Sequence, residues 1–419
     1  MNKHTIGDLY QMQSLPLKYK IMMTEQRIKA WYDHFDGDVY VSFSGGKDST
    51  VLVDIVTKMG LTDIPLVFVD TGLEYPEIRE FVKGYGDRVT WLRPKMNFKQ
   101  VIEKYGYPFF SKEIGDTIHG ARKYLKEYFQ RDENTDYNNV NYFPNAQHMA
   151  EILGIRGIKE HKEELTQKVE QSLNEVAKRS ESKYKWGGVS GYLLMLLGQY
   201  PHTQDGEKTG EVSTMFNRSK YKFMLEAPFE VTGKGCCATM KKNPVHKYAK
   251  ETGRHPITAQ MASESRLRTS SWLKNGCNGF QMKDPISNPM SFWTEQDVLL
   301  YIKQNYLPIC SVYGDIIEDL EGTEEVEGQL TMSDIAGWED QGIFDAKRRP
   351  LKTTGCNRTG CMFCGFGCHL EKGEGRFERM KKTHPKMYDY IMRPWEEGGL
   401  NYKEVIDWIN EHGNLNIRY

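Results

Sequence analysis

Cysteine is absent from the first 235 residues of this 419-residue chain, and half of its eight cysteines fall within a single window of thirteen residues. A secreted disulfide framework normally spaces its cysteines more evenly along a short chain, so this distribution argues against that class of protein. Thiols clustered in a long chain favour a metal site or redox chemistry instead.

Long hydrophobic runs are missing as well. The longest purely apolar stretch runs from Tyr192 to Leu197, whereas a membrane-spanning helix needs about 20 apolar residues. The first twenty residues contain no apolar core of the kind found in secretory signals. We therefore expect a cytoplasmic protein with no membrane partner.

The chain also lacks an excess of charge of either sign. Lys and Arg number 56 against 57 Asp and Glu, which gives a net charge of −1. A nucleic-acid partner would therefore need a local basic patch. Residues 371–386, with six Lys or Arg and three acidic residues, are one candidate, and a solvated helix face is the alternative interpretation.

The amino-terminal part alternates between short apolar runs and amphipathic segments. A helix over 18–35 precedes strands at 39–43, 64–70 and 88–94, which are separated by helices at 49–59 and 76–85. This order predicts an α/β fold with a parallel sheet covered on both faces. Open sheets of this kind bind ligands outside the carboxyl ends of their strands.

The pattern predicts five segments. Charged helical stretches such as 158–179 interrupt the α/β rhythm, which resumes near residue 255, and seven acidic residues lie within 315–327. We expect a first part of the α/β core at 1–110, a mostly helical insertion at 111–220, a second part of the core at 221–310, an acidic loop with the cysteine-rich segment at 311–371, and carboxy-terminal helices at 372–419.

The stretch SFSGGKDST, residues 42–50, joins the first strand to the next helix. Two glycines permit a tight turn close to a ligand, and the helix amides that follow favour an anion. A lysine and several hydroxyls add further donors, so the stretch predicts a phosphate site, although it does not fit a Walker A loop. The candidate residues are Ser42, Ser44, Gly45, Gly46, Lys47, Asp48, Ser49 and Thr50. An ordinary strand–turn–helix corner capped by Asp48 is the alternative.

This stretch resembles the PP-loop of the N-type ATP pyrophosphatases, specifically that of the phosphoadenylyl-sulfate (PAPS) reductase family. Residues 68–77, 235–244 and 256–268 resemble further family segments in the same order, and the similarity covers roughly 20–110 and 225–305. It implies an adenine nucleotide α-hydrolase-like, Rossmann-like sheet. It also implies that Asp70, Thr71 and Gly72 lie along the nucleoside, and that Arg266 or Arg268 faces the phosphates.

The chain departs from that family at two places. Assimilatory PAPS reductases end in a motif whose cysteine attacks sulfur, but this chain has no cysteine after Cys368. The loop MASESRLR, residues 261–268, also lacks the family's paired arginines at their usual place. Both departures weigh against a straightforward sulfonucleotide reductase.

The cysteine window has the spacing C-x4-C-x2-C-x3-C, with Cys356, Cys361, Cys364 and Cys368 as candidate metal ligands. One crowded set of thiolates favours a [4Fe–4S] cluster, because structural zinc usually takes two separated pairs. Zinc is the alternative metal and free thiols are the third possibility. The window resembles that of the ATP-pyrophosphatase subunit of DNA phosphorothioation systems.

A second group, the adjacent Cys236 and Cys237, has three interpretations. One of the two carries sulfur in catalysis, or the pair shares a cluster with Cys361 and Cys364 as in adenylyl-sulfate reductases, or both are small buried residues.

Together these features predict a PP-loop enzyme that converts ATP to AMP and pyrophosphate for sulfur transfer, with Mg²⁺ bridging the phosphates. The catalytic candidates are Lys47, Asp48, Cys236 and Cys237. A sulfur-donor protein and a tRNA or DNA acceptor are the expected partners. The alternatives are reduction of PAPS or adenylyl sulfate, and a nucleotide-sensing or nucleic-acid-binding module with structural zinc.

Overall fold

The computed structural model describes residues 2–129, 191–198, 200–204, 207–319 and 349–419. It divides into two compact units, each built from two stretches of chain. Unit 1 comprises Met1–Lys95 and Thr239–Met362, and unit 2 comprises Met96–Ala238 and Phe363–Tyr419.

Unit 1 is built on a six-stranded sheet in the order β3-β2-β1-β7-β9-β8. Adjacent strands run parallel except for the β8–β9 pair at one edge. From the central strand β1 the chain first extends the sheet to one side and later to the other, which creates a topological switch point beside β1. The strands are β1 (Val39–Ser42), β2 (Leu66–Val69), β3 (Val89–Leu92), β7 (His255–Ile257), β8 (Asn278–Gly279) and β9 (Ile286–Ser287).

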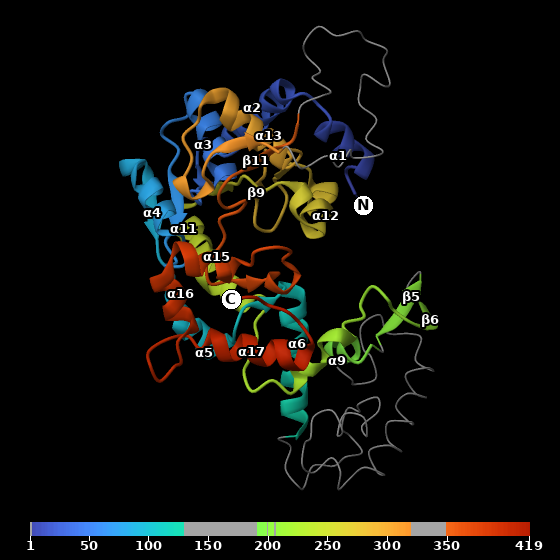
Figure 1. Cartoon of the computed structure of the whole chain (residues 1–419). Helices are drawn as coiled ribbons and strands as arrows, with labels where there is room; N and C mark the ends of the chain where they lie inside the picture. Colours follow the sequence, from blue (N-terminus) through green and yellow to red (C-terminus); the bar gives the residue numbers. More distant parts are fainter. Residues whose placement is uncertain (1, 130–190, 199, 205–206, 320–348) are drawn as a thin grey trace. The chain divides into compact units, whose positions relative to one another are not determined.

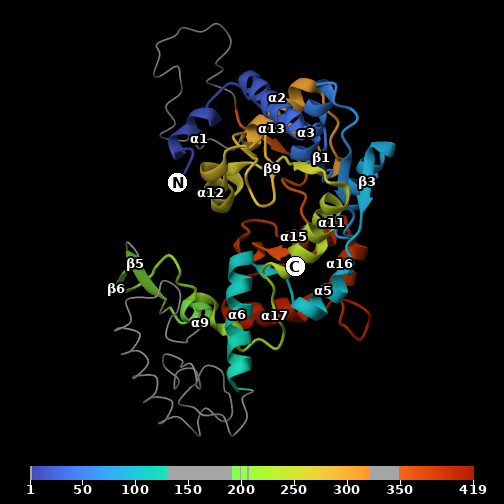
Figure 2. The same ribbon diagram turned by 180° about the vertical axis from the view of Figure 1, so that it is seen from behind.

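Helices cover both faces of this sheet. The helix α3 packs against α2 and α13, and Figures 1 and 2 show these three on one side of the strands and α11 on the other. The helices of unit 1 are α1 (Ile6–Gln13), α2 (Leu17–His34), α3 (Lys47–Lys58), α4 (Pro76–Lys83), α11 (Asn243–Thr252), α12 (Arg266–Asn275) and α13 (Glu295–Asn305), with short 3₁₀ turns at Gly86–Arg88, Ala262–Glu264 and Ser311–Tyr313.

Strand alternation decides which face each β1 side chain meets. Val39 and Val41 are fully buried in the core together with Ile28 of α2. Tyr40, on the opposite face, meets Tyr248 of α11 edge-on at 5.3 Å. The face under α11 is thus the one that carries polar and aromatic side chains.

A buried ion pair joins α2 to α13 within this unit. The Nζ atom of Lys20 lies 2.7 Å from Oδ2 of Asp297, and the lysine side chain is 2% exposed. Asp297 also accepts hydrogen bonds from the backbone amide and hydroxyl of Thr294 at the start of α13. One carboxylate therefore caps a helix and neutralises a buried cation.

The short strands β10 (Ile316–Glu318) and β11 (Leu351–Thr353) form an antiparallel pair in unit 1. The pairing continues irregularly beyond them, because the amides of Gly355 and Cys356 donate to the carbonyls of Tyr313 and Val312. The start of the cysteine window is thereby fixed against the turn that contains Tyr313.

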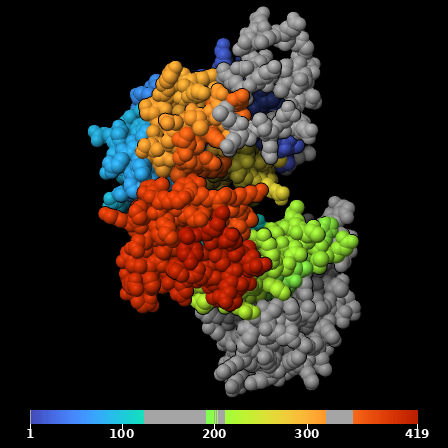
Figure 3. Space-filling model, viewed as in Figure 1, coloured from blue at the N-terminus to red at the C-terminus, as the bar shows by residue number. Residues whose placement is uncertain are grey.

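Unit 2 contains α5 (Phe98–Tyr105), β4 (Phe109–Phe110), α6 (Lys112–Phe129), α9 (Gly191–Leu196), β5 (Pro201–Gln204), β6 (Glu207–Val212), α10 (Gly235–Cys237), β12 (Gly365–Phe366), α15 (Arg376–Thr383), α16 (Pro385–Met392) and α17 (Tyr402–Gly413), with 3₁₀ segments η3 (Ser219–Leu225) and η7 (Cys368–Leu370). A π-helical turn at Ala238–Lys242 follows α10. Helix α17 packs on η3, and in the space-filling view the carboxy-terminal residues (red) adjoin the green segment of this unit (Figure 3).

The expected α/β class with a mainly parallel sheet is confirmed. The division into units differs from the five expected segments, because α5, β4 and α10 pack in unit 2 although 1–110 and 221–310 were expected to form one core. In the described part of the expected insertion, α6 and α9 accompany an antiparallel hairpin, β5–β6, and the expected helix at 158–179 lies outside the described residues. Most of the acidic stretch 315–327 lies outside them too. Within the described part of the chain, no helix is both long and apolar enough to span a membrane.

Candidate functional site

The glycine turn follows β1 at the switch point of the sheet. Gly45 has a φ of +70°, and a Cβ there would lie under 3.0 Å from methyl groups of Val82 and Ile78. Gly46 is the N-cap of α3, and its Cβ would lie 3.2 Å from three hydroxyl oxygens, among them Tyr313 Oη. Glycine is therefore required at the two positions for different reasons. At position 45 the backbone is left-handed, and at position 46 a side chain would meet the oxygen atoms near the helix start.

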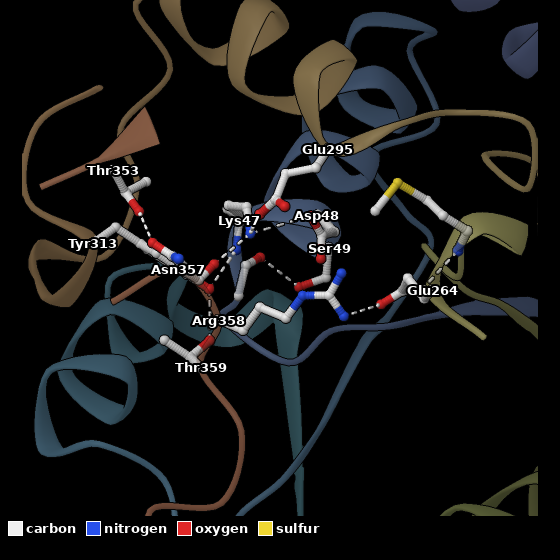
Figure 4. A network of polar contacts seen from close by, with 12 residues as sticks. Lys47, Asp48, Ser49, Glu264, Glu295, Tyr313, Thr353, Asn357, Arg358 and Thr359 are labelled. Carbon is white, nitrogen blue, oxygen red and sulfur yellow. Dashed lines mark hydrogen bonds and ion pairs between the residues drawn. The ribbon is translucent and has the colours of Figure 1, made fainter. Parts of the chain in front are cut away.

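Lys47, the first residue of α3, is buried, with 3% of its side chain exposed. Its ammonium group donates to the carbonyl of Asn357 at 2.7 Å and lies 3.0 Å from Oε1 of Glu295 (Figure 4). The cation is thus held at the helix start by one carboxylate and one carbonyl.

The backbone amide of Lys47 donates to the hydroxyl oxygen of Tyr313 at 3.0 Å. That hydroxyl also lies 2.6 Å from Oγ1 of Thr359. Burial raises the pKa of Tyr313 to about 12, so its hydroxyl stays protonated near neutral pH. We expected the amides at the start of this helix to bind an anion. In this structure the Lys47 amide instead donates to an oxygen atom of the chain itself, the Tyr313 hydroxyl (Figure 4).

Asp48 keeps 31% of its side chain exposed, but its Oδ1 atom is buried without a hydrogen-bond partner among the described residues. That oxygen lies 4.0 Å from Nζ of Lys47. Burial raises the pKa of Asp48, and the cations of Lys47, Arg358 and Arg268 oppose this rise. The carboxylate is costly to ionise where it stands, which is typical of a group that serves function rather than stability.

The hydroxyls of the turn divide into two sets. Ser49 and Thr50 both donate to the carbonyl of Gly46 and are buried. Ser44 Oγ lies 3.0 Å from Ser49 Oγ and accepts from the Gly46 amide, and Ser42 and Ser44 line a cavity. In this structure Thr50 therefore shapes the turn, whereas Ser42 and Ser44 are available to a ligand.

Asp70, Thr71 and Gly72 follow the carboxyl end of β2, as expected. Oδ2 of Asp70 accepts from Arg79 at 2.9 Å, and both the amide and the hydroxyl of Thr71 donate to Glu74. Gly72 has a φ of +76°. Glu74 in turn lines the cavity, so this segment is fixed at the cavity's edge by its own polar contacts.

An arginine pair forms beside the turn, although the sequence showed none in the expected loop. Arg268 and Arg358 both pair with the carboxylate of Glu264. Burial lowers the pKa of Arg268, and the positive charge of the nearby Arg358 lowers it further. Arg266 is exposed and has no ion pair or hydrogen bond with a described residue. Of the two expected arginines, Arg268 is the one that joins the site, and its partner comes from the cysteine window.

A cavity of about 990 Å³ lies in unit 1 beside the turn, between the sheet and α11. Its floor includes side chains of β1, β2 and β7, and its wall includes Tyr75, Thr359 and the inner face of α11. This volume is at the upper end of the range for small-molecule sites, about 300 to 1,000 Å³. The cavity and the glycine turn share Ser42 and Ser44, so one ligand can occupy both.

The candidate metal ligands divide between the units. Cys356 and Cys361 belong to unit 1, and Cys364 and Cys368 to unit 2. Cys356 is buried, and its thiol donates to Tyr75 Oη at 3.6 Å. Among the described residues, no group of three or more His, Cys, Asp or Glu side chains is close enough to hold a metal ion.

Two segments of unit 2 contain cysteines, and both lie next to strand β4. One leads into α10 with Cys236 and Cys237, and the other contains β12 between Cys364 and Cys368. The segment before α10 pairs with Tyr107, which precedes β4, and β12 pairs with β4 itself. Burial raises the pKa of the fully buried Tyr402, and the thiols of Cys364, Cys236 and Cys368 add to that effect. These three thiols therefore lie in the neighbourhood of one buried phenol, while Cys237 is partly exposed. Thiols are suitable donors for iron or zinc.

Sequence reasoning missed Glu295, Tyr313, Asn357, Arg358 and Thr359 (Figure 4). Each reaches the turn from a part of the chain more than 240 residues away, and nothing in their local sequence indicates it. The basic residues of α11 were missed as well, although their helical spacing was readable.

The fold and the site define an α/β protein with a glycine turn and a helix start at the switch point of its sheet. Residues 38–140 match the family model of the phosphoadenosine phosphosulfate reductase domain. Over these residues the chain is therefore similar to the PAPS reductase family, as its motifs predicted.

Two curated relatives are uncharacterized proteins of Methanocaldococcus jannaschii. One is 39% identical over 113 residues, which are 25% of this chain and 23% of the relative, and the other is 32% identical over 111 residues, 24% and 26% respectively. The chain thus spans about a quarter of the length of these relatives. A crystal structure of PAPS reductase from Candida auris in a phosphate complex is similar over 69% of this chain and 82% of that one, with 12% identity and a TM-score of 0.31, too low to bear on function.

Proposed function

We propose that this protein is an enzyme of sulfur chemistry that binds an adenine nucleotide with its phosphates on the turn Ser44–Ser49. The observation that carries the proposal is the Lys47 amide at the start of α3, which donates to an oxygen atom beside a cavity large enough for a nucleotide. A phosphate oxygen in place of the Tyr313 hydroxyl would meet the same amide and the α3 dipole. Lys47 would then exchange its carbonyl contact for a phosphate.

With ATP, a substrate oxygen would attack the α-phosphorus. An oxygen–phosphorus bond forms, the bond to the β-phosphate's bridging oxygen breaks, and pyrophosphate leaves. A sulfur nucleophile then displaces AMP from the adenylated substrate. Lys47 and the turn amides stabilise the charge that develops on pyrophosphate, and Arg268 with Arg358 lies beside them. Mg²⁺ neutralises the phosphates when bound, and the buried, unpartnered Oδ1 of Asp48 suits a cation.

A [4Fe–4S] cluster on Cys356, Cys361, Cys364 and Cys368 is part of this proposal. The support is their spacing and the thiol chemistry of the donors. Burial raises the pKa of Cys368 to about 12, with Arg376 opposing, so this thiolate needs a metal or a cation to be stable. Zinc is the alternative. A cluster that Cys236 and Cys237 share with Cys361 and Cys364 is the other variant.

Reduction of PAPS or adenylyl sulfate is the second candidate. The family match favours it. Product analysis of the anaerobically purified chain separates the functions: AMP and pyrophosphate from ATP support the first, and sulfite from PAPS supports the second. Nucleotide binding with neither product would contradict both and leave a nucleotide-sensing module.

A further inference from the structure

The helix α11 presents one continuous face to the cavity. The cavity lining includes Val245, His246, Ala249 and Lys250 of α11, its N-cap Lys242 with the adjacent Lys241, and its C-cap Gly253. From Lys242 to Lys250 the spacing is i, i+3, i+4, i+7 and i+8, which is a single helical stripe. No residue of α11 is fully buried. The stripe therefore borders open space rather than protein.

Two lysines and a histidine, Lys242, His246 and Lys250, lie in one row of this stripe, and all three are exposed. No ion pair or hydrogen bond joins any of their side chains to a residue in the described part of the chain. By contrast, Lys247, on the same helix but outside the cavity lining, lies 3.6 Å from Glu251. Lys242 and Lys250, unlike Lys247, thus face the cavity without a carboxylate partner among the described residues.

The basic segment at 371–386, which the sequence singled out, behaves in the opposite way. In α15 and its approach, Arg376 pairs with Glu371, and Arg379 and Lys382 both pair with Glu374. Three of its six basic residues are thus paired with carboxylates of the same segment. The α11 row carries charge that the fold leaves for a partner.

The shape of the row indicates the partner's chemistry. A single phosphate is held by donors that converge on one point, but Lys242, His246 and Lys250 are spaced about 6 Å apart along the helix axis, four residues at about 1.5 Å each. A line of hydrogen-bond donors with a lysine cation at each end matches a line of regularly spaced anions, and a phosphodiester strand is such a line. The row ends in the same cavity as Ser42 and Ser44, where the nucleotide phosphates are proposed to bind.

We propose that Lys242, His246 and Lys250 bind the phosphodiester backbone of a single-stranded nucleic-acid segment whose end enters the cavity as the acceptor. This inference rests on the proposed function, because the acceptor is useful only where a nucleotide activates it. The strand brings its base to the nucleotide, and the α11 row fixes its backbone without reading its sequence.

Fluorescence anisotropy with the full-length chain and labelled DNA and RNA strands of about 12 nucleotides tests this proposal. We expect the double variant Lys242→Ala/Lys250→Ala to bind the favoured strand at least tenfold more weakly than the unmodified chain. For this variant, the slope of log affinity against log salt concentration should also be smaller in magnitude by about 1.4. Each phosphate contact to a single strand contributes about 0.7 to that slope, and the variant loses two contacts. The matched control Lys247→Ala should stay within about twofold, because its charge is paired outside the cavity.

Unchanged strand affinity in the double variant, or failure of the unmodified chain to bind either strand, would overturn the proposal. Loss of ATP affinity with unchanged strand affinity would overturn it too, by assigning the row to the nucleotide. Lys47→Ala separates this test from the proposed function: unchanged ATP affinity in that variant would remove the nucleotide site, whatever the strand result.

Discussion

Glu295 holds the ammonium group of Lys47 at 3.0 Å, although 248 positions separate the two residues in the chain. Glu295 occupies the first turn of α13, and Lys47 begins α3, which packs against α13. The carboxylate compensates a lysine that would otherwise be a buried, isolated charge. The same pairing lowers the positive charge available to a phosphate until a ligand competes for Lys47.

The Tyr313 hydroxyl competes with phosphate for the Lys47 amide, so Tyr313→Phe should tighten nucleotide binding. Removing a neutral hydrogen bond of about 0.5 to 1.5 kcal/mol corresponds to roughly two- to tenfold. The ligand-free variant should melt at a lower temperature because the amide loses its acceptor. Isothermal titration and thermal unfolding check both effects. Weaker binding in the variant would mean that Tyr313 supports the ligand rather than opposing it.

Asp48 should lower stability at neutral pH. Because burial raises its pKa in the folded chain, the folded state binds more protons than the unfolded state between the ordinary and the raised pKa. The penalty of the charged carboxylate is therefore present above the folded pKa and disappears as the pH falls through it. Asp48→Asn should raise the melting temperature at pH 7 and reduce turnover, and the stability gain should shrink in acid. A gain that grows as the pH falls would contradict this account.

The Lys20–Asp297 pair should matter far more than an exposed pair of similar geometry. Asp297→Asn leaves a buried cation without its counter-ion, so the free energy of unfolding should fall by about 3 to 5 kcal/mol. Lys29 and Asp33 lie 2.9 Å apart but are exposed, and Asp33→Asn should cost less than about 1 kcal/mol. Denaturant titration of both variants measures the difference. Equal effects would show that burial does not decide the energy of these pairs.

A cluster on the cysteine window predicts about four irons and four sulfides per chain in protein purified without oxygen. Serine at Cys356, Cys361, Cys364 or Cys368 should abolish this iron. Serine at Cys277, which is buried and has no assigned role, should leave it intact. Iron and sulfide analysis distinguishes the alternatives: loss in Cys236→Ser or Cys237→Ser favours a shared set of ligands, and stoichiometric zinc instead of iron defeats the cluster.

The local architecture could be predicted from the sequence because the periodicity of strands and helices depends on residues that are close together in the chain. Val39–Ser42, the glycine turn and Lys47–Lys58 form the expected strand, turn and helix. Among the expected ligand residues, Thr50 donates a hydrogen bond within the turn and Arg266 is exposed. The turn's position next to β7 follows from sheet topology, which local pattern does not determine.

The partners of Lys47 could not be predicted in the same way. Tyr313, Asn357 and Arg358 reach the site because the start of the cysteine window is hydrogen-bonded to the turn at 311–313. Such contacts depend on tertiary packing between distant segments. The α11 row is different, because an i, i+4, i+8 spacing of Lys242, His246 and Lys250 is visible in the sequence. The cavity beside this row could not be predicted, because it is formed by segments that are distant in the sequence.

Nucleotide affinity of Lys47→Ala tests the central claim most directly. Isothermal titration of the unmodified chain, Lys47→Ala and the control Lys58→Ala with ATP and with PAPS compares a buried lysine at the helix start with a half-exposed one at the other end of the same helix. A charge-assisted hydrogen bond contributes about 1.5 to 3 kcal/mol, so Lys47→Ala should weaken binding by about ten- to a hundredfold. Lys58→Ala should bind as the unmodified chain does. Equal affinity in all three folded proteins would contradict a phosphate site at this turn.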